Sequence, residues 1–358
     1  MCRGHASTST WEDPGSIELK VVDAIVVGGG PAGSTCAWKL HDAGLDVLVL
    51  DRAAFPRTKL CAGWLTPEAL KDLELDSQDY PLSFMTFDEL HLHWKVFTLK
   101  LKSRQHSIRR FEFDDFLLRR AGTRVLQHKV REIRRDGGDY VIDGQFRCKY
   151  LVGAGGTACP VYRTLFHERN PRSSVLQTAT YEQEFAFDWK NGECHLWFFD
   201  AGLPGYAWYV PKANGYINVG LGGMADQLKH RAGHLKQHWD QFVDKLEKRG
   251  LVSYDNYHPS GYSYYLRGNV DVVSDDNAYI VGDAVGLATV DMCEGIGPAV
   301  KSGLLAARSI VSGADYSLAG IDKFSGGGFF SKVLERRFVA ANLNPQGRRS
   351  PSYEPGTR

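Results

Sequence analysis

The sequence has few of the features that would place a protein in a membrane, in a secretory route or on nucleic acid. No run approaches the roughly 18 uncharged apolar residues of a spanning helix, and residues 1–20 lack the apolar run of a signal peptide. The net charge of +1 gives no reason to expect nucleic acid as a partner. These absences predict a cytoplasmic protein, and they are compatible with peripheral contact with a membrane.

The sequence also has few features of a metal-binding or disulfide-bonded protein. The seven cysteines are scattered and form no CxxC pair, which argues against a disulfide framework and against a zinc site. The histidines show no metal-ligand spacing along the chain. We therefore expect reduced cysteines and no metal site.

What the chain does have is an ordinary globular composition and a clear alternation of helix and strand patterns. Its 358 residues, 43% of them apolar, are enough for two domains. "VVDAIVVGGGPAG" followed by "LDVLVLD" predicts a strand, a glycine turn, a helix and a second strand, the βαβ unit of a parallel sheet. The alternating, aromatic stretch from Tyr80 to Arg104 and the strand-rich residues 175–270 predict antiparallel strands. The expected fold class is α/β, with a Rossmann-like domain interleaved with an antiparallel β-sheet domain.

The predicted domain boundaries follow this alternation. Residues 21–78, 105–170 and 271–315 are assigned to the nucleotide-binding domain, and residues 79–104 and 171–270 to the substrate-binding domain. Residues 1–20 are predicted to form a mobile head, and residues 316–358 a C-terminal segment whose last ~20 residues are disordered. One helix is expected to open near Arg110, and another lies within "ADQLKHRAGHLKQHWDQFVDKLEKRG".

The first turn carries a dinucleotide-binding pattern. In "VVGGGPAG" the positions of GxGxxG are Gly28, Gly30 and Gly33, which allow a tight turn, a close approach of the backbone to a pyrophosphate, and close packing of helix on strand. The phosphates would lie at the helix N-terminus, where free N–H groups favour negative charge. Asp51 ends the second strand and is placed to accept hydrogen bonds from a ribose. Neighbouring residues are predicted to contact the same cofactor: Pro31, Ala32 and Arg52.

A second match to the dinucleotide-binding pattern, "VGAGGTA", follows a later predicted strand. Cys159 and Pro160 come directly after it, and no acidic residue ends a strand at the required distance. We interpret it as a loop beside the first nucleotide site. A second dinucleotide-binding domain is the alternative.

A third segment favours FAD over a nicotinamide cofactor. "YIVGDAVG" is an apolar strand that ends at Gly282 and Asp283, and an acidic side chain there can accept hydrogen bonds from a ribityl chain. The helix in "EGIGPAVKSGLLAARSI" begins with glycines, and its first amides would face the N1–C2=O edge of a flavin. These amides belong to Gly295, Ile296 and Gly297. A helix cap followed by a flexible turn is the alternative for this segment.

Four segments together resemble flavoprotein monooxygenase-type folds, whose FAD-binding domain is of the glutathione reductase type. They are "VGGGPAGSTCAWKL", "RRFEFD", "YIVGDAVG" and "EGIGPAV", and the resemblance covers roughly residues 20–315. It implies that Arg110, four residues before Asp114, approaches the phosphates or ribityl chain of FAD. Where such proteins have an Asp in "ADG", this chain has Ala154, Gly155 and Gly156, so that contact is missing or replaced.

Two further motifs resemble geranylgeranyl reductases. "KLCAGWL" is similar to their C-x-G segment, and "GYAWYVPKANGYINVGLGG" to their Y-x-W-x-[FV]-P-K…N-V-G-x-G stretch. The resemblance implies an FAD-dependent enzyme that reduces C=C bonds of a hydrophobic, prenyl-like or lipid substrate. Cys61, with Ala62, would lie beside the flavin and could supply the proton that must accompany a hydride. The residues predicted to line the substrate site are Tyr206, Trp208 and Pro211.

The resemblance also implies an external electron donor, namely NADPH, free reduced flavin or a ferredoxin. Cys61 is alternatively a buried structural thiol, and the aromatic residues are alternatively ordinary sheet core. Three other functions stay open: an aromatic hydroxylase that uses O₂, a flavin-dependent halogenase, and a flavin-binding module without activity. Halogenases carry W-x-W-x-I-P, whereas here the stretch reads "YAWYVP" with Tyr206 at the first position, which counts against halogenation.

Overall fold

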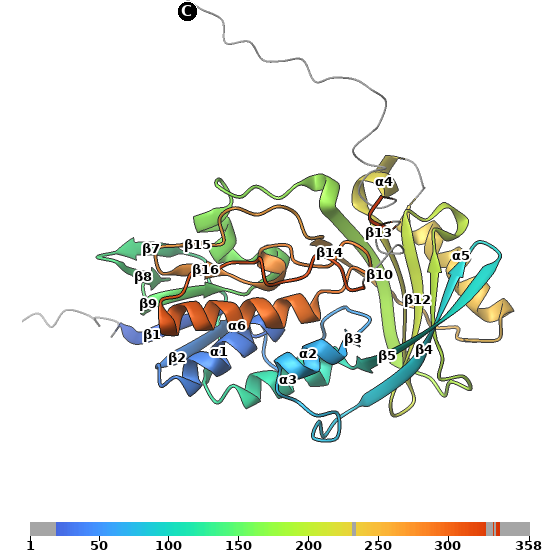
Figure 1. Ribbon diagram of the computed structural model, residues 1–358, viewed down its shortest axis with the longest axis horizontal. Coiled ribbons are helices and arrows are strands. Elements are labelled where there is room, and N and C mark those ends of the chain that lie inside the picture. The colour runs from blue at the N-terminus through green and yellow to red at the C-terminus, as the bar shows by residue number, and fades with distance from the viewer. Residues whose placement is uncertain (1–18, 231–233, 327–331, 333, 337–358) are drawn as a thin grey trace, which may run out of the picture.

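The computed structural model describes residues 19–230, 234–326, 332 and 334–336 (Figure 1). The predicted mobile head, apart from its last two residues, and the predicted disordered C-terminus lie outside these residues. Within the described part of the chain, no helix has the length and apolar character needed to cross a membrane. The two sheets and their helices form the mixed α/β architecture predicted from the sequence.

The first sheet is built around five parallel strands, in the order β16-β9-β1-β2-β6, with β15, β8 and β7 added antiparallel. β1 and β2 pair in register through buried apolar side chains, as expected for a parallel sheet covered on both faces. The strands are β1 (Lys20–Val27), β2 (Val47–Asp51), β6 (Arg124–Gln127), β7 (Ile133–Asp136), β8 (Asp139–Ile142), β9 (Phe146–Gly153), β15 (Ser274–Asp275) and β16 (Ala278–Ile280).

Helices α1 (Pro31–Asp42), α3 (Arg110–Arg120) and α6 (Ile296–Ser312) lie beside this sheet (Figure 1). α1 and α6 approach closely because Gly303 of α6 has no side chain. A Cβ there would lie 2.4 Å from the carbonyl oxygen of Ala32. The backbones of α1 and α6 are therefore in direct contact, close to the glycine turn that precedes α1.

The second sheet is mostly antiparallel and has the order β14-β10-β13-β12-β11-β4-β5-β3. β11 and β4 are its parallel pair. The strands are β3 (Trp64–Leu65), β4 (Phe84–Trp94), β5 (Phe97–Ile108), β10 (Gln177–Ala186), β11 (Cys194–Phe198), β12 (Gly205–Lys212), β13 (Tyr216–Met224) and β14 (Ser260–Tyr265). The division into domains stays a prediction, but two strands cross its borders: β3 joins the second sheet, and β5 runs past residue 104.

The remaining helices are α2 (Pro67–Asp72), α4 (Ala225–His230) and α5 (Leu235–Lys248). The stretch predicted as one helix therefore contains two, on either side of residues 231–233, which lie outside the described part. α5 packs Trp239 and Phe242 against one face of the second sheet, where Phe242 contacts Trp197 and Trp239 contacts Tyr181. The other face of this sheet is free to line a cavity. Short helical turns occur at Gly156–Ala158, Tyr162–Phe166, Ser174–Leu176, Asp200–Gly202 and Gly282–Ala284.

Candidate active site

The carboxyl ends of the five parallel strands lie at one edge of the first sheet, and the glycine turn after β1 lies there. Gly28 has a φ of +114°, and a Cβ on it would lie 2.4 Å from the carbonyl oxygen of Ala154. A Cβ on Gly33 would lie 1.9 Å from the carbonyl oxygen of Gly28. The turn therefore needs glycine at both positions. Gly30, the residue before α1, provides no side-chain cap, so the first N–H groups of the helix are left for a ligand.

Asp51 is held rigidly at the end of β2. The N–H of Gly29 donates to its Oδ2 at 2.8 Å, and the N–H of Ala53 donates to its Oδ1 at 2.9 Å. Each carboxylate oxygen has a second lone pair, so the group can still accept from a ribose hydroxyl. The glycine turn and the acidic residue are thus locked together by the backbone.

Basic side chains border the same space. Arg110 donates to both carboxylate oxygens of the fully buried Asp114, at 2.7 and 2.8 Å, and Arg57 lies 3.4 Å from the same carboxylate. Lys59 lies over the ring of Tyr262, 3.1 Å from its centroid, and burial lowers the pKa of Lys59 to about 8. Arg57 and Arg110 share one carboxylate, so positive charge remains beside Gly30 of the glycine turn, which suits a pyrophosphate.

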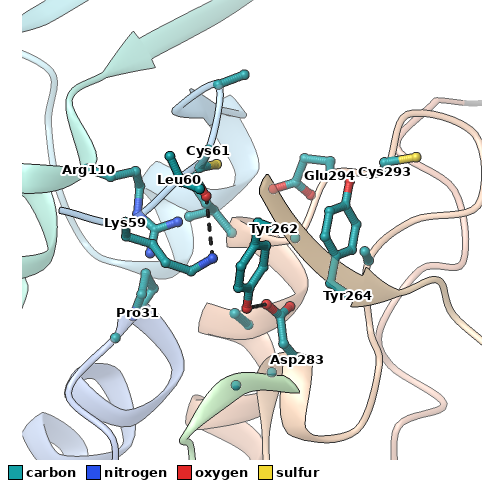
Figure 2. A pocket seen from close by; sticks show the side chains of 18 of the residues that line it. Pro31, Lys59, Leu60, Cys61, Arg110, Tyr262, Tyr264, Asp283, Cys293 and Glu294 are labelled. Atoms are coloured by element: carbon teal, nitrogen blue, oxygen red, sulfur yellow. Dashed lines mark hydrogen bonds between the residues drawn. The ribbon is translucent and has the colours of Figure 1, made fainter. Parts of the chain in front are cut away.

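The third segment arrives from β16 and α6. Gly282 has a φ of +61°, and Asp283 beside it accepts a hydrogen bond from the hydroxyl of Tyr262 at 3.4 Å (Figure 2). At the start of α6, the prediction for Gly297 is not met. Its N–H donates to Oε1 of Glu294 at 2.7 Å, so this amide is already paired. Glu294 lies just before α6 and its carboxylate reaches forward to the first turn of that helix, while Gly295 and Ile296 line the cavity wall.

These segments enclose one cavity of about 810 Å³ that continues onto the open face of the second sheet. Three predicted site residues do not line it, namely Gly33, Gly297 and Pro211. The other predicted residues do: Gly28, Gly30, Pro31, Ala32, Asp51, Arg52, Cys61, Ala62, Arg110, Tyr206, Trp208, Gly282, Asp283, Gly295 and Ile296. A helix N-terminus without a side-chain cap, a strand-end carboxylate and buried basic groups in one elongated cavity fit FAD.

The correction for Pro211 follows from strand geometry. Side chains on a strand alternate between faces, so Tyr206, Trp208 and Val210 of β12 face the cavity while Pro211 faces away. Pro211 instead accepts a hydrogen bond at its carbonyl oxygen, from the hydroxyl of Ser107 at 2.8 Å. Its contribution is to hold β5 against β12.

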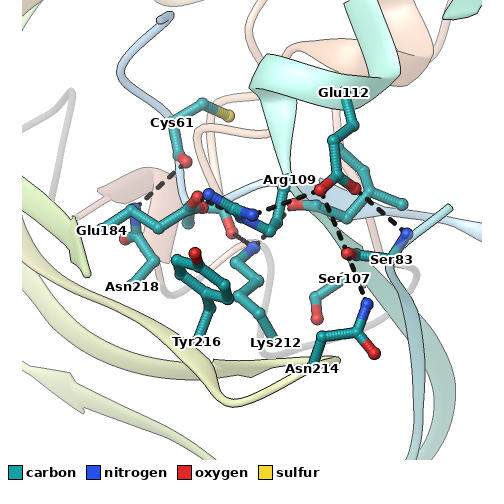
Figure 3. Close-up of polar contacts among 12 residues, drawn as sticks. Cys61, Ser83, Ser107, Arg109, Glu112, Glu184, Lys212, Asn214, Tyr216 and Asn218 are labelled. Carbon is teal, nitrogen blue, oxygen red and sulfur yellow. Dashed lines mark hydrogen bonds and ion pairs between the residues drawn. The ribbon is translucent and has the colours of Figure 1, made fainter. Parts of the chain in front are cut away.

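The loop that carries Cys61 is fixed from below by a buried lysine. Lys212 is fully buried and donates from Nζ to the carbonyl oxygens of Ala62 and Ile108 (Figure 3). Gly63 has a φ of +66°, and a Cβ there would lie 2.0 Å from the Ile108 oxygen and 2.6 Å from Nζ of Lys212. The spacing of the cysteine and glycine therefore reflects a backbone turn wrapped over a lysine.

The "NVG" segment of β13, residues 218–220, contacts the loop that carries Cys61. Nδ2 of Asn218 donates to the carbonyl oxygen of Cys61 at 3.4 Å, and Oδ1 of Asn218 accepts from the indole N–H of Trp208 at 2.7 Å. Around this core, Arg109 bridges Glu184 of β10 and Glu112 of α3, at 2.7 and 3.2 Å. The two motifs shared with geranylgeranyl reductases thus meet in space and position one thiol.

Sequence reasoning missed Glu182, which lines the cavity near this loop. It lies on β10, is buried, and accepts from Nδ2 of Asn218 at 3.3 Å. Burial raises the pKa of Glu182 to about 7, so it can hold a proton near neutral pH. The only sequence signal was an acidic residue in a strand of alternating pattern, "TATYEQEFA", which is too common to single it out.

The comparisons with known proteins agree with this geometry. The family model of the FAD-dependent oxidoreductases matches residues 23–106. An uncharacterized protein of Methanosarcina barkeri is 32% identical over 340 residues, which cover 90% of this chain and 80% of that protein. A menaquinone reductase of Mycobacterium tuberculosis is 30% identical over 319 residues, covering 81% and 76%. Digeranylgeranylglycerophospholipid reductase 3 of Methanosphaera stadtmanae is 22% identical over 361 residues, covering 92% and 89%.

Solved structures share the fold. A geranylgeranyl bacteriochlorophyll reductase-like protein of Thermoplasma acidophilum superposes with a TM-score of 0.72 at 20% identity, covering 91% of this chain and 86% of that one. A flavin-dependent brominase gives 0.65 at 20% identity, covering 86% and 81%, a likeness that concerns the fold alone. Fold and site define an FAD-dependent oxidoreductase. Within that class, the chain belongs to the family that includes the uncharacterized protein of Methanosarcina barkeri and the menaquinone reductase of Mycobacterium tuberculosis.

Proposed function

We propose that this protein reduces a C=C bond in the polyprenyl chain of a lipid. The observation that carries the proposal is the apolar arm of the cavity on the second sheet. Leu90 and Leu92 of β4, Leu196 of β11, and Leu99 and Leu101 of β5 line it. An arm of aliphatic side chains leading away from Cys61 matches a long hydrocarbon substrate better than a compact aromatic one.

The arm continues to an exposed apolar edge. Leu99 and Leu101 are 58% and 42% exposed, and Phe97 at the tip of the same strand is 73% exposed. Contiguous exposed apolar residues beside a binding cavity suggest that the substrate enters from a lipid surface. The names of two relatives point the same way, since menaquinone and digeranylgeranylglycerophospholipid both carry polyprenyl chains.

Bound, reduced FAD would supply hydride chemistry at one alkene carbon, and the protein would then have to supply a proton to the other. Two side chains at the cavity wall can do so. Cys61 carries a thiol near Arg110, and its Sγ accepts the N–H of Gly63 at 3.3 Å. Glu182 is partly protonated near pH 7 because burial raises its pKa to about 7. We propose Cys61 as the group nearest the reacting bond and Glu182 as the proton reservoir behind it.

The experiment is an anaerobic single-turnover assay. The holoenzyme is reduced with dithionite, freed of excess reductant, and mixed with menaquinone or a geranylgeranylated lipid. We expect flavin reoxidation together with a product that has gained two hydrogens. A product that appears only with O₂ and contains an added oxygen would instead identify a hydroxylase, and a halogenated product in the presence of halide would identify a halogenase.

The proton donor is tested by paired variants. Cys61→Ala and Glu182→Gln should each slow the protonation step about 100-fold or more, while FAD content is unchanged. Cys293→Ala is the matched control, because Cys293 also places a thiol at the cavity wall. If Cys61→Ala turns over at the wild-type rate, Cys61 is not the proton donor and its role is structural.

Reloading the flavin requires an electron donor from outside the chain. We propose one of NADPH, free reduced flavin or a ferredoxin, and each can be supplied separately to the oxidised holoenzyme. We expect only the physiological donor to reduce the flavin and to support repeated turnover.

A further inference from the structure

A group of histidine and glutamate side chains lies on the second sheet, on the face turned away from the cavity. His91 of β4 and His195 of β11 are directly paired across the two parallel strands. Leu90, Leu92 and Leu196 alternate with them and face the cavity, so the histidines face the other side. We propose that His91, His195 and Glu193 bind a divalent transition-metal ion of the zinc class.

The distances fit such an ion. One nitrogen from each histidine and one oxygen of Glu193 all lie within 4.8 Å of one another. Oε2 of Glu193 is 3.3 Å from Nδ1 of His91 and 3.7 Å from Nε2 of His195. Ligand atoms about 2.1 Å from a tetrahedral zinc ion are about 3.4 Å apart. The two distances from Glu193 are close to this spacing, and the third pair of atoms, the two histidine nitrogens, lies within 4.8 Å.

An unpaired buried nitrogen points independently to a ligand. His195 is only 6% exposed, and its Nε2 has no hydrogen-bond partner. Buried polar atoms are nearly always paired, so an orphan beside a carboxylate needs an explanation. A metal ion in contact with Nε2 and the carboxylate would provide the missing partner.

The outer contacts of both rings have the arrangement that metal-binding histidines use. If Nε2 of His195 is a ligand, its Nδ1 carries the proton and donates to Nε2 of His93 at 3.0 Å. His93 in turn donates from Nδ1 to the hydroxyl of Thr98 at 2.9 Å. On the other ring, Nε2 of His91 donates to Oε1 of Glu89 at 2.9 Å, which leaves Nδ1 for the ion. Such outer hydrogen bonds fix the ring orientation and the tautomer.

Charge and access are also suitable. Glu193 is 42% exposed, so an ion can enter from solvent and keep a water as its fourth ligand. Nδ2 of Asn191 donates to Oε2 of Glu193 at 2.8 Å and orients the carboxylate. Lys100 lies 3.2 Å from Glu89 and offsets part of the negative charge, but its side chain is 59% exposed and free to turn outward. An ion here would join β4 to β11 behind the apolar arm of the cavity.

The test measures metal binding to the FAD-loaded protein, so it does not depend on the proposed reaction. The holoenzyme is stripped with a chelator, incubated with ZnCl₂, passed through a desalting column, and analysed for zinc and FAD. We expect one zinc per chain. With Co²⁺ we expect the visible d–d bands of a four-coordinate site in a difference spectrum against the metal-free holoenzyme. Zinc at a hundredfold excess over its dissociation constant should raise Tm by about 3 to 4 °C.

The variants make the assignment specific. Glu193→Gln and His91→Gln should lose the bound zinc and the Tm rise, and His93→Gln should weaken zinc binding about 10- to 100-fold. His106→Gln is the matched control, because His106 is a buried histidine of β5 that contacts Thr86 and lies outside the group. The proposal is overturned if the wild type retains no zinc, or if Glu193→Gln, whose surface position should leave folding intact, retains as much as the wild type.

Discussion

Replacing Gly63 with alanine tests whether the Cys61 loop is positioned by the lysine beneath it. Alanine at a φ of +66° costs about 1–2 kcal/mol. Its Cβ would also lie 2.0 Å from the Ile108 oxygen, where ordinary contacts begin at 3.4 Å. That oxygen accepts from Lys212, and the carbonyl of Gly63 accepts from the N–H of Ile108 at 2.9 Å, so the loop itself must move by about 1.4 Å. Overpacking of this kind adds about 1–3 kcal/mol.

The total of about 2–5 kcal/mol should lower Tm by about 3–7 °C for a chain of this length. A displacement of 1 Å or more at the reacting centre should lower turnover about 100-fold. The assay pairs thermal unfolding of the holoenzyme with single-turnover kinetics. Gly250→Ala is the matched control, because Gly250 has a φ of +64° and nothing within 4 Å of its Cβ position. If Gly63→Ala behaves like Gly250→Ala in both measurements, the positioning argument is wrong.

Three further outcomes are expected. Gly33→Ala should weaken FAD binding about tenfold or more, because the added Cβ would lie 1.9 Å from the carbonyl oxygen of Gly28. Gly320→Ala is the control, because nothing lies within 4 Å of the Cβ position of Gly320, and the FAD content of the purified protein should be unchanged. Turnover should fall as pH rises through about 7, where Glu182 loses its proton. The pH–rate profile of Glu182→Gln should lack this decrease, and a profile equal to that of the wild type would refute the role of Glu182 as a proton donor. Phe97→Glu should reduce binding to lipid vesicles about 10- to 100-fold in a flotation assay, whereas Val311→Glu, at an exposed apolar residue of α6, should not. If the two variants bind vesicles equally well, β5 is not the lipid contact.

Local signals were enough to predict the FAD cofactor. The glycine spacing, the acidic residue after the second strand and the apolar strand before Asp283 are each written in consecutive residues. The parallel pairing of β2, β1, β9 and β16 brings them to one edge of the sheet. The exception at Gly297 arose because Glu294, three residues earlier, folds back onto its amide, a contact that spacing does not reveal.

The substrate side was predictable only in part. Tyr206 and Trp208 share a strand face, as their spacing implies, but Pro211 has the opposite parity and faces away. Glu182 and the paired histidines gave no usable signal. The position of Glu182 depends on its burial against Asn218, and His91 and His195 meet only because β4 and β11 are neighbours.

The sequence by itself determined the class of protein, an α/β chain that binds FAD, because the turns, helix starts and strand ends that indicate this class are local properties. Only the tertiary structure decided how those motifs work together. It placed Lys212 beneath the Cys61 loop, aligned an aliphatic arm with that thiol, and raised the pKa of Glu182. The physical reason is that burial, long-range hydrogen bonding and the pairing of distant strands depend on the whole chain.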